Sequence, residues 1–252
     1  MPKFFVEGKQ VINDQIQIIG EDVNHISNVL RLKKEDEIII GNKENGKSYQ
    51  AKIMILNKDN IICEIIKQVE ETTEPQVDIT IYQGLPKAEK MEYIIQKATE
   101  IGAKQIVPVA MKRCIVKLNA KDEIKKRQRW QKIAEVAAKQ SGRDKIPQIQ
   151  EIKTIQELPL EIQQYHLFLI AYEQEKECTL KQVLTEIKKQ KIQDCKIGVL
   201  IGPEGGIEEE EIQQLKENSN VKIITLGKRI LRTETASLVL ISNILYELEM
   251  ES

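Results

Sequence analysis

The sequence has few of the residues that build metal centres or disulfide frameworks. Its 252 residues include only two histidines and four cysteines, and no two cysteines form a CxxC pair. These numbers exclude a histidine-rich metal centre and argue against a thiolate zinc site or a disulfide framework. We therefore expect no bound metal. The GxSxG turn that carries the nucleophile of many hydrolases is missing as well.

Long apolar runs and an excess of one charge are also missing. No apolar run approaches the roughly 18 residues that a membrane span needs, and the first ten residues lack the apolar centre of a signal peptide. We therefore expect a cytoplasmic protein without membrane contact. Lysine and arginine total 38 against 39 aspartates and glutamates, so any electrostatic role must come from a local patch. A hydrophobic share of 41% is typical of a chain with a folded core.

The first 70 residues contain short strand-like stretches separated by turn sequences. A short helix is expected over residues 22–30. Several short strands at close spacing predict a small β-barrel. The polar segment 70–75 ends in proline and reads as a linker, so we expect one domain over residues 1–72 and a second over 73–252. The predicted strands of the first domain cover residues 3–7, 15–19, 37–41, 48–56 and 61–67.

From residue 77 onward, strands alternate with helices. This rhythm predicts an α/β domain with a mostly parallel sheet and helices on both faces. The last helix is apolar nearly all round, which indicates burial either in a subunit interface or between the sheet and another helix of the same chain. The predicted strands cover residues 77–83, 105–109, 166–172, 196–201 and 222–226, and the predicted helices cover 87–101, 124–141, 179–189, 208–218 and 233–249.

Two glycine-containing loops, residues 201–206 and 226–236, follow the last two predicted strands. Open α/β sheets bind ligands at the carboxyl ends of their strands, where such loops lie. The first loop has neither of the glycine patterns that bind nucleotide phosphates, and four consecutive glutamates, 208–211, would repel a polyphosphate. The expected ligand is therefore neutral or partly cationic. S-adenosylmethionine meets that condition because it carries a sulfonium and no phosphate.

Arginines are rare and unevenly placed. The chain has seven arginines against 31 lysines, so an arginine marks a position where the fork geometry of a guanidinium is useful. Arg229 and Arg232 lie in the second glycine loop. The segment 112–145 carries 12 basic and 4 acidic residues, and such a patch either binds the phosphates of RNA or forms a solvated helix face.

Six segments of the chain together resemble the ribosomal RNA small-subunit methyltransferase E family. Members of this family are SPOUT-class enzymes that methylate N3 of a uridine in 16S ribosomal RNA. The resemblance runs along nearly the whole chain, and GPEGG followed by RILRTETA is its most specific part. The segments are His25–Arg31, Gln83–Lys87 with Gln96–Gly102, Lys112–Cys114, Gln140–Arg143, Ile201–Gly206 and Leu226–Ala236.

The resemblance implies a fold, a cofactor and partners. The N-terminal domain should be a PUA-like β-barrel that helps to hold RNA, and the C-terminal domain a SPOUT α/β domain with a trefoil knot. S-adenosylmethionine should bind between the knotted loops. The partners should be 16S ribosomal RNA in the small ribosomal subunit and a second copy of the chain.

The resemblance also implies roles for single residues. Arg232 should stabilise the uracil anion or an adjacent phosphate, although it could instead pair with Glu234 or Glu204. Glu204 should orient the cofactor or accept a proton. The residues expected to contact the cofactor are Leu169, Ala171, Ile201, Gly202, Pro203, Gly205, Gly206, Leu226, Gly227, Ile230, Leu231, Thr235 and Ala236. The residues expected to contact RNA are Arg31, Lys112, Arg113, Arg127, Arg129, Arg143 and Arg229.

Three other functions stay open from the sequence. A non-catalytic RNA-binding factor for ribosome assembly would keep the fold without binding the cofactor. A SPOUT methyltransferase acting on transfer RNA is compatible with the PUA-like barrel. An enzyme acting on a small nucleotide is disfavoured, because the phosphate-binding motifs are missing and the helix after the first loop begins with acidic residues.

Overall fold

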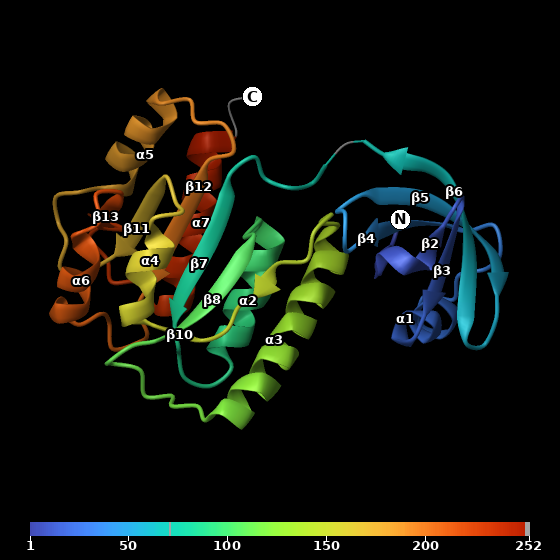
Figure 1. Ribbon diagram of the computed structural model, residues 1–252, viewed down its shortest axis with the longest axis horizontal. Coiled ribbons are helices and arrows are strands. Elements are labelled where there is room, and N and C mark those ends of the chain that lie inside the picture. The colour runs from blue at the N-terminus through green and yellow to red at the C-terminus, as the bar shows by residue number, and fades with distance from the viewer. Residues whose placement is uncertain (71, 250–252) are drawn as a thin grey trace. The chain divides into compact units, whose positions relative to one another are not determined.

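The computed structural model describes residues 1–70 and 72–249, so Glu71, inside the predicted linker, lies outside the described residues. The chain forms two compact units, drawn in Figure 1. The first unit contains Met1–Glu74 together with Ala138–Ile146, and the second contains Pro75–Ala137 and the chain from Pro147 onward.

The first unit is one six-stranded sheet curled around an apolar core. Its strand order is β1-β4-β5-β6-β3-β2, with β1 parallel to β4 and the other pairs antiparallel. Alternate residues point inward, as Ile16 and Ile18 do in β3, and they meet in a common cluster. The predicted barrel is confirmed, with β1 and β2 at the open ends of the sheet. The strands are β1 (Lys3–Val6), β2 (Val11–Ile12), β3 (Gln15–Ile19), β4 (Glu37–Asn42), β5 (Ser48–Leu56) and β6 (Asn60–Val69).

The predicted helix over residues 22–30 is only partly α-helical. It begins as α1 (Glu21–Asn24) and continues as a π-helical turn over His25–Val29. The amide of Leu30 donates to the carbonyl of His25, five residues back, which widens this turn. Ile26 is buried within the turn, whereas His25 is exposed.

The second unit is a parallel sheet with helices on both faces, as Figure 1 shows. The strand order is β10-β8-β7-β12-β11-β13, with β9 beside β8, and every recorded pair is parallel. The α/β architecture is thus confirmed, and the threaded loop of the knot stays a prediction. The strands are β7 (Asp78–Gly84), β8 (Gln105–Ala110), β9 (Gln148–Ile149), β10 (Lys153–Thr154), β11 (Leu167–Ala171), β12 (Lys196–Ile201) and β13 (Val221–Ile224). The helices are α2 (Lys90–Ile101), α3 (Ala120–Ser141), α4 (Leu158–Ile162), α5 (Leu180–Lys189), α6 (Glu209–Lys216) and α7 (Thr233–Glu249).

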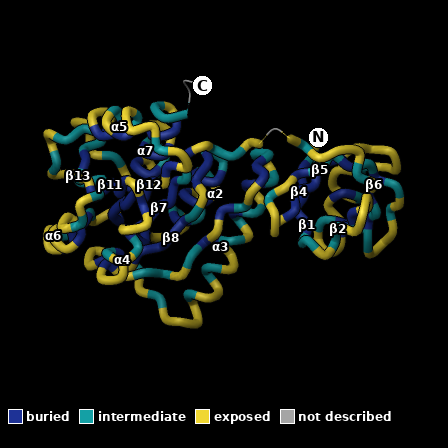
Figure 2. The backbone as a smooth tube through the Cα atoms, turned by 45° about the horizontal axis from the view of Figure 1, so that its top comes forward, coloured by how far each residue is buried: buried dark blue, intermediate teal, exposed yellow. Residues whose placement is uncertain are grey.

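The central strands form the core of the second unit. Strands β7, β11 and β12 are buried along almost their whole length, and Figure 2 shows them in dark blue. Their sequences are continuous apolar runs because helices cover both faces of a parallel sheet. In the register, Ile201 lies beside Gln83 on one side and Ala171 on the other, and Ala171 also lies beside Ile224. The carboxyl ends of four strands therefore meet at one edge of the sheet.

Helix α7 is covered largely by its own chain. It packs on α2, α5, β7 and β12, which bury Leu240, Ile241 and Ile244 completely. The interpretation that the helix lies between the sheet and other helices of the same chain is thus confirmed for the face that carries these three residues. Tyr246 is exposed, and the subunit interface stays a prediction.

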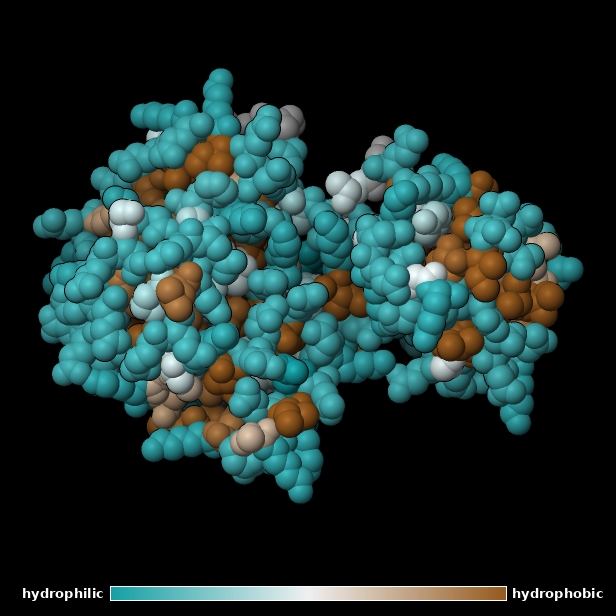
Figure 3. All heavy atoms as spheres, in the orientation of Figure 1, coloured by the Kyte–Doolittle hydropathy of each residue, from teal (hydrophilic) through white to brown (hydrophobic). Residues whose placement is uncertain are grey.

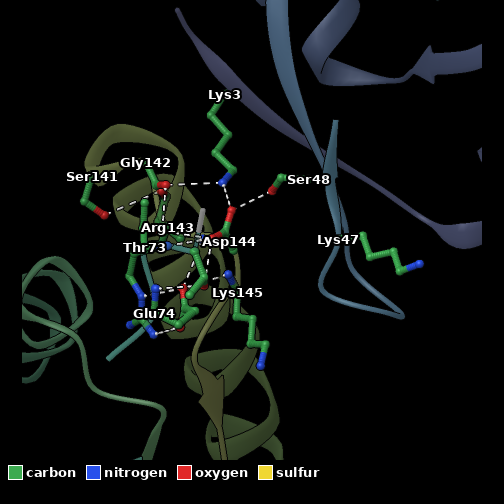
Figure 4. Close-up of polar contacts among 12 residues, drawn as sticks. Lys3, Lys47, Ser48, Thr73, Glu74, Ser141, Gly142, Arg143, Asp144 and Lys145 are labelled. Carbon is green, nitrogen blue, oxygen red and sulfur yellow. Dashed lines mark hydrogen bonds and ion pairs between the residues drawn. The ribbon is translucent and has the colours of Figure 1, made fainter. Parts of the chain in front are cut away.

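The end of α3 and the loop after it group with the first unit, although they follow the predicted boundary between residues 72 and 73. Figure 4 shows the polar contacts that hold this segment. The carboxylate of Asp144 accepts hydrogen bonds from Lys3 Nζ at 2.5 Å, Ser48 Oγ at 2.6 Å and the Thr73 amide at 2.8 Å. Lys3 and Asp144 are both buried, and buried charges of opposite sign need one another because water does not solvate them. Segment 138–146 is therefore part of the barrel unit although it is distant in sequence.

The surface is mainly polar. Figure 3 shows hydrophilic residues in teal over most of the visible face, with brown apolar side chains between them. In the first unit the exposed apolar residues include Ile12, Ile19, Ile55 and Ile66. Across residues 1–70 and 72–249, no helix is both long and apolar enough to cross a bilayer.

Candidate active site

A pocket of about 1030 Å³ lies at the edge of the sheet where the strands of the second unit end. Its floor is formed by the ends of β11 and β12, and its walls by the two glycine loops that the sequence singles out. Ligand sites in open α/β sheets occupy this edge, and their volumes are of this order. The pocket is therefore the candidate site for a small molecule.

Glycines in the first loop allow the backbone to line the pocket. A Cβ at Gly202 would lie 2.8 Å from Ile207 Cγ1, and Gly206 adopts a φ of +74° beside the carboxylate of Glu173. Side chains at either position would fill the space or strain the turn. The loop also packs closely on β7, because a Cβ at Gly84 would lie 2.6 Å from Pro203 Cδ. The tightly packed backbone of this loop therefore forms a cradle along one wall of the pocket.

A buried polar network supports both loops from below. Gln83, at the end of β7, donates from Nε2 to Thr233 Oγ1 at 2.9 Å, and Thr233 Oγ1 donates to the carbonyl of Gly202 at 2.7 Å. Ser237 Oγ donates to Gln83 Oε1 at 2.6 Å. Gln83, Thr233 and Ser237 are all buried. Since a buried hydrogen bond is costly to break, this network fixes the first loop relative to the start of α7.

A lysine and two glutamates lie at the rim of the pocket. Lys90 Nζ is 2.9 Å from Glu204 Oε1 and 3.5 Å from Glu234 Oε2. The amide of Lys87 also donates to the Glu204 carboxylate. Burial opposes ionisation of Glu204, but the hydrogen bonds from Lys90 and from the Lys87 amide outweigh it and hold the pKa of Glu204 below its ordinary value. Glu204 is therefore ionised, and its negative charge is already compensated by groups of the same chain.

Two of the four glutamates after the first loop, Glu208 and Glu210, have basic side chains as partners. Arg113 Nε donates to Glu208 Oε1 at 2.8 Å, and its Nη1 donates to the Gly205 carbonyl at 2.9 Å. Lys112 pairs with Glu210 through its ammonium, and its amide donates to Glu211 at 2.9 Å. The hydrogen bond from Arg113 is the main reason that the pKa of Glu208 is lowered. Arg113 thus holds the first glycine loop in place. This structural role was not part of the prediction, which gave Arg113 only an RNA contact.

Most residues predicted to contact the cofactor do line this pocket. The exceptions are Leu169 and Thr235. Leu169 is buried in the middle of β11, two residues before the strand ends, and Thr235 is an exposed residue of α7. The residues in agreement are Ala171, Ile201, Gly202, Pro203, Gly205, Gly206, Leu226, Gly227, Ile230, Leu231 and Ala236.

The two residues predicted to be catalytic, Arg232 and Glu204, also line the pocket. Arg232 is exposed, and within the described residues it forms no ion pair with Glu204 or Glu234. Those two carboxylates pair with Lys90 instead. The guanidinium of Arg232 is therefore available to a substrate, and its catalytic role stays a prediction.

The residues predicted to bind RNA are in different environments. Arg229 lines the pocket, and Arg31 is exposed beside the π-helical turn. Arg127 and Arg129 form surface ion pairs with Glu151 and Glu92, and such pairs are weak enough for a phosphate to displace them. Their RNA contacts stay a prediction.

Arg143 is in a different position from the one that RNA binding requires. Its side chain is 4% exposed and its guanidinium pairs with Glu74 in the first unit. A buried guanidinium that is held by a carboxylate does not face a phosphate group. The assignment of Arg143 to RNA contact is therefore wrong for this structure.

Several pocket residues were not predicted from the sequence. Lys90 is the most important, because its partners Glu204 and Glu234 are far away along the chain. The Gln83–Lys87 segment, which lies just before Lys90 and carries part of the family resemblance, is the sequence signal that could have indicated Lys90. Glu175 accepts hydrogen bonds from three successive amides and so serves the turn before α5. The other unpredicted lining residues are Glu173, Lys176, Thr179, Thr225 and Thr233.

A metal-binding group does not stand out. Among the residues that the structure describes, no three or more histidine, cysteine, aspartate or glutamate side chains lie in a cluster that could hold a metal ion.

Comparisons with known proteins relate both units to RNA methyltransferases. Residues 72–245 match the family model of the RNA methyltransferase domain, and residues 18–66 match that of the RNA methyltransferase PUA domain. The ribosomal RNA small subunit methyltransferase E of Bacillus subtilis is 36% identical over 253 residues, covering 99% of this chain and 98% of the relative.

Two solved structures resemble the whole chain. One is a ribosomal RNA small subunit methyltransferase E from Neisseria gonorrhoeae bound to S-adenosyl methionine, with a TM-score of 0.84 and 30% identity over 98% of this chain and 97% of the other. The second is a methyltransferase from Legionella pneumophila in complex with its cofactor SAM, with a TM-score of 0.81 and 27% identity over 97% and 96% of the two chains.

Proposed function

The chain belongs to the ribosomal RNA small subunit methyltransferase E family, and from this premise we propose that it transfers the methyl group of S-adenosylmethionine to N3 of a uridine in 16S ribosomal RNA. The substrate would be the RNA of the small ribosomal subunit, and the reaction would take place in the cytoplasm.

The observation that carries this proposal is the pocket between the two glycine loops. The backbone cradle around Gly202 and Gly206 forms part of its lining, and the carboxylate of Glu173 lies on the same lining, where it suits a ligand with a positive charge. S-adenosylmethionine supplies an electrophilic methyl group on a sulfonium sulfur when it is bound. The residues Ala171, Leu226 and Ile230 would contribute apolar surface to hold it.

Arg232 is the residue best placed to serve the acceptor base. The N3–H of uracil is an imide whose acidity resembles that of a phenol, with a pKa of about 10. Loss of that proton leaves negative charge on the two neighbouring carbonyl oxygens. The exposed guanidinium of Arg232 lines the pocket without a carboxylate partner, so it can stabilise that charge as it develops.

Glu204 fits the positioning role better than the role of a base. Lys90 and the Lys87 amide favour its ionised form, and they occupy its carboxylate oxygens. A carboxylate whose pKa is lowered is a weaker proton acceptor. We therefore assign to Glu204 the task of fixing the first glycine loop against the start of α2.

The protein would act as a homodimer whose interface lies near the pocket. Ile230 in the second loop is 81% exposed and Tyr246 on α7 is 67% exposed, although both are large apolar side chains. A second copy would cover such residues. Light scattering coupled to gel filtration would test this, and a monomer at micromolar concentration would contradict it.

One experiment tests the activity directly. The protein is incubated with isotopically labelled S-adenosylmethionine and small subunits that lack the modification, and the RNA is digested and examined by mass spectrometry. Labelled 3-methyluridine is the expected product. Transfer RNA in place of subunits tests the alternative substrate, since label in transfer RNA alone would redirect the proposal.

The non-catalytic alternative makes a different prediction. An assembly factor that only binds RNA would retain RNA affinity without affinity for S-adenosylmethionine. Isothermal titration with the cofactor separates the two functions, and the absence of measurable binding would favour the assembly factor.

A further inference from the structure

Lys90 connects the two loops that form the pocket. It is the first residue of α2, and its ammonium lies 2.9 Å from Glu204, in the first loop, and 3.5 Å from Glu234, which follows the second loop in the first turn of α7. All three side chains are partly buried, because the exposed fractions of Lys90, Glu204 and Glu234 are 31%, 28% and 17%. One cation therefore lies between two anions that come from different loops.

Glu234 depends on Lys90 for its charge balance. Its Oε2 atom is buried and has no hydrogen-bond partner within the described residues, so the ammonium of Lys90 is the group that compensates it. Glu204 is less dependent, because the Lys87 amide also donates to it. An uncompensated carboxylate in a partly buried site moves toward water or takes up a proton. Removal of Lys90 would thus disturb the start of α7 more than it disturbs the first loop.

The start of α7 in turn sets the position of Arg232. The amide of Ala236 donates to the carbonyl of Arg232 at 2.8 Å, which makes Arg232 the residue that enters the helix. Glu234 lies two positions later in the same turn. A shift of Glu234 therefore moves the guanidinium of Arg232 relative to the pocket.

We propose that Lys90 is a positioning residue, which holds Glu204 and Glu234 together so that both glycine loops and Arg232 keep the geometry needed for methyl transfer. The expected effect on methyl transfer rests on the proposed function. Its structural part, the coupling of the two loops through one ammonium, holds independently of the substrate.

The test compares Lys90→Met with a matched variant on the same helix. Lys97 pairs with Glu100 at 2.9 Å on α2, is similarly exposed at 35%, and does not line the pocket, so Lys97→Met removes an equivalent charge and ion pair. Hydrogen–deuterium exchange is measured on the ligand-free proteins. Lys90→Met should speed exchange about tenfold in residues 230–236 and by a smaller factor in residues 202–206, whereas Lys97→Met should leave both segments unchanged.

Two further measurements connect the loops to function. In Lys90→Met, we expect the rate of single-turnover methyl transfer to fall at least about tenfold. The affinity for S-adenosylhomocysteine, measured by isothermal titration, should fall by a smaller factor. Lys90→Arg should restore most of both, because it keeps the cation between the carboxylates. The double variant Lys90→Met/Glu234→Gln should recover slow exchange in residues 230–236, since the uncompensated charge is then gone.

The outcomes separate this proposal from the proposed function. Wild-type exchange in both loops of Lys90→Met would overturn the positioning role, whatever the enzyme methylates. Equal acceleration in Lys97→Met would overturn it as well, by showing a general effect of α2 stability. A wild-type protein that fails to bind S-adenosylhomocysteine would instead reject the proposed function, while the exchange data would still decide whether Lys90 couples the loops.

Discussion

At the residue scale, the partners of the arginines separate structural from functional positions. Four of the seven arginines pair with carboxylates within the described chain, whereas Arg31, Arg229 and Arg232 do not. Two of these three line the pocket. A guanidinium without a protein partner at the rim of a pocket is free to bind a negative group, such as a deprotonated base or a phosphate.

Replacing Arg232 with alanine should therefore lower methyl transfer and leave the fold intact. Arg232 is exposed, so its loss removes no buried contact, and we expect single-turnover methyl transfer to fall at least about tenfold while the melting temperature stays unchanged. Arg232→Lys would show how much of the effect needs the fork geometry. An unchanged rate under single-turnover conditions would reject the role of Arg232 in the chemistry.

Sequence patterns identified the pocket loops but not the ion pairs that hold them. GPEGG and RILRTETA are contiguous, so their glycines and arginines are visible as motifs. Lys90 and Glu204 are more than a hundred positions apart, and no periodicity in a single sequence connects them. The position of Leu169 relative to the pocket was not predictable either, since a continuous apolar strand does not reveal which of its residues reaches the pocket.

At the scale of elements, most helices and strands were predictable from periodicity, and the exceptions have local causes. Helix α2 begins at Lys90 and not at Lys87, because Ala88 adopts a φ of +54° and the Lys87 amide donates to Glu204. The two-residue strands β9 and β10 are too short to show any alternation. Helix α4 was missed because five residues show less than two turns of a helical pattern.

The glycine loop predicts a specific effect of a single methyl group. Gly206→Ala would place a Cβ against the Glu173 carboxylate at a φ of +74°, and we expect affinity for S-adenosylhomocysteine to fall at least about tenfold by isothermal titration. Gly142→Ala is the matched control, because Gly142 also has a φ of +74° and no atom lies within 4 Å of the added Cβ. Both variants should lose about 1 kcal/mol of stability from backbone strain. Equal cofactor affinity in the two variants would contradict the cradle.

At the scale of the whole molecule, the buried charges around Asp144 hold the first unit together. Burial opposes ionisation of Asp144, but hydrogen bonds from Lys3, Ser48 and the Thr73 amide outweigh it and lower its pKa from 3.8 to about 2. A lowered pKa stabilises the folded state above pH 3.8, and this contribution is lost as the pH falls toward 2.

Asp144→Asn should remove this pH dependence. The difference in free energy of unfolding between wild type and Asp144→Asn, measured by urea denaturation, should shrink by about 2 kcal/mol between pH 5 and pH 2. Asp59→Asn, an exposed aspartate of the same unit, serves as the control and should show little change. A difference that stays constant across this pH range would contradict the lowered pKa.

The basic patch of the second unit should contribute to RNA affinity through salt-dependent contacts. Reversing the charges with Arg127→Glu/Arg129→Glu should lower the slope of log Kd against log salt by about 1 to 2. The reason is that RNA binding releases fewer counterions when fewer phosphate contacts form. Arg143 is excluded from this test because its buried pair with Glu74 is needed for the first unit. Lys181→Glu/Lys189→Glu on α5 makes the same charge change elsewhere, and equal slopes in both double variants would count against the patch.

Segment 138–146 has a consequence for how the protein is made. The barrel strands are complete at Val69, yet Arg143 and Asp144 are synthesised only after strands β7 and β8 of the second unit. Until those two side chains leave the ribosomal exit tunnel, Lys3 and Glu74 lack their counter-charges. The N-terminal unit therefore reaches its final stability late in translation, and a nascent chain halted near residue 100 should be cleaved readily by protease within its barrel.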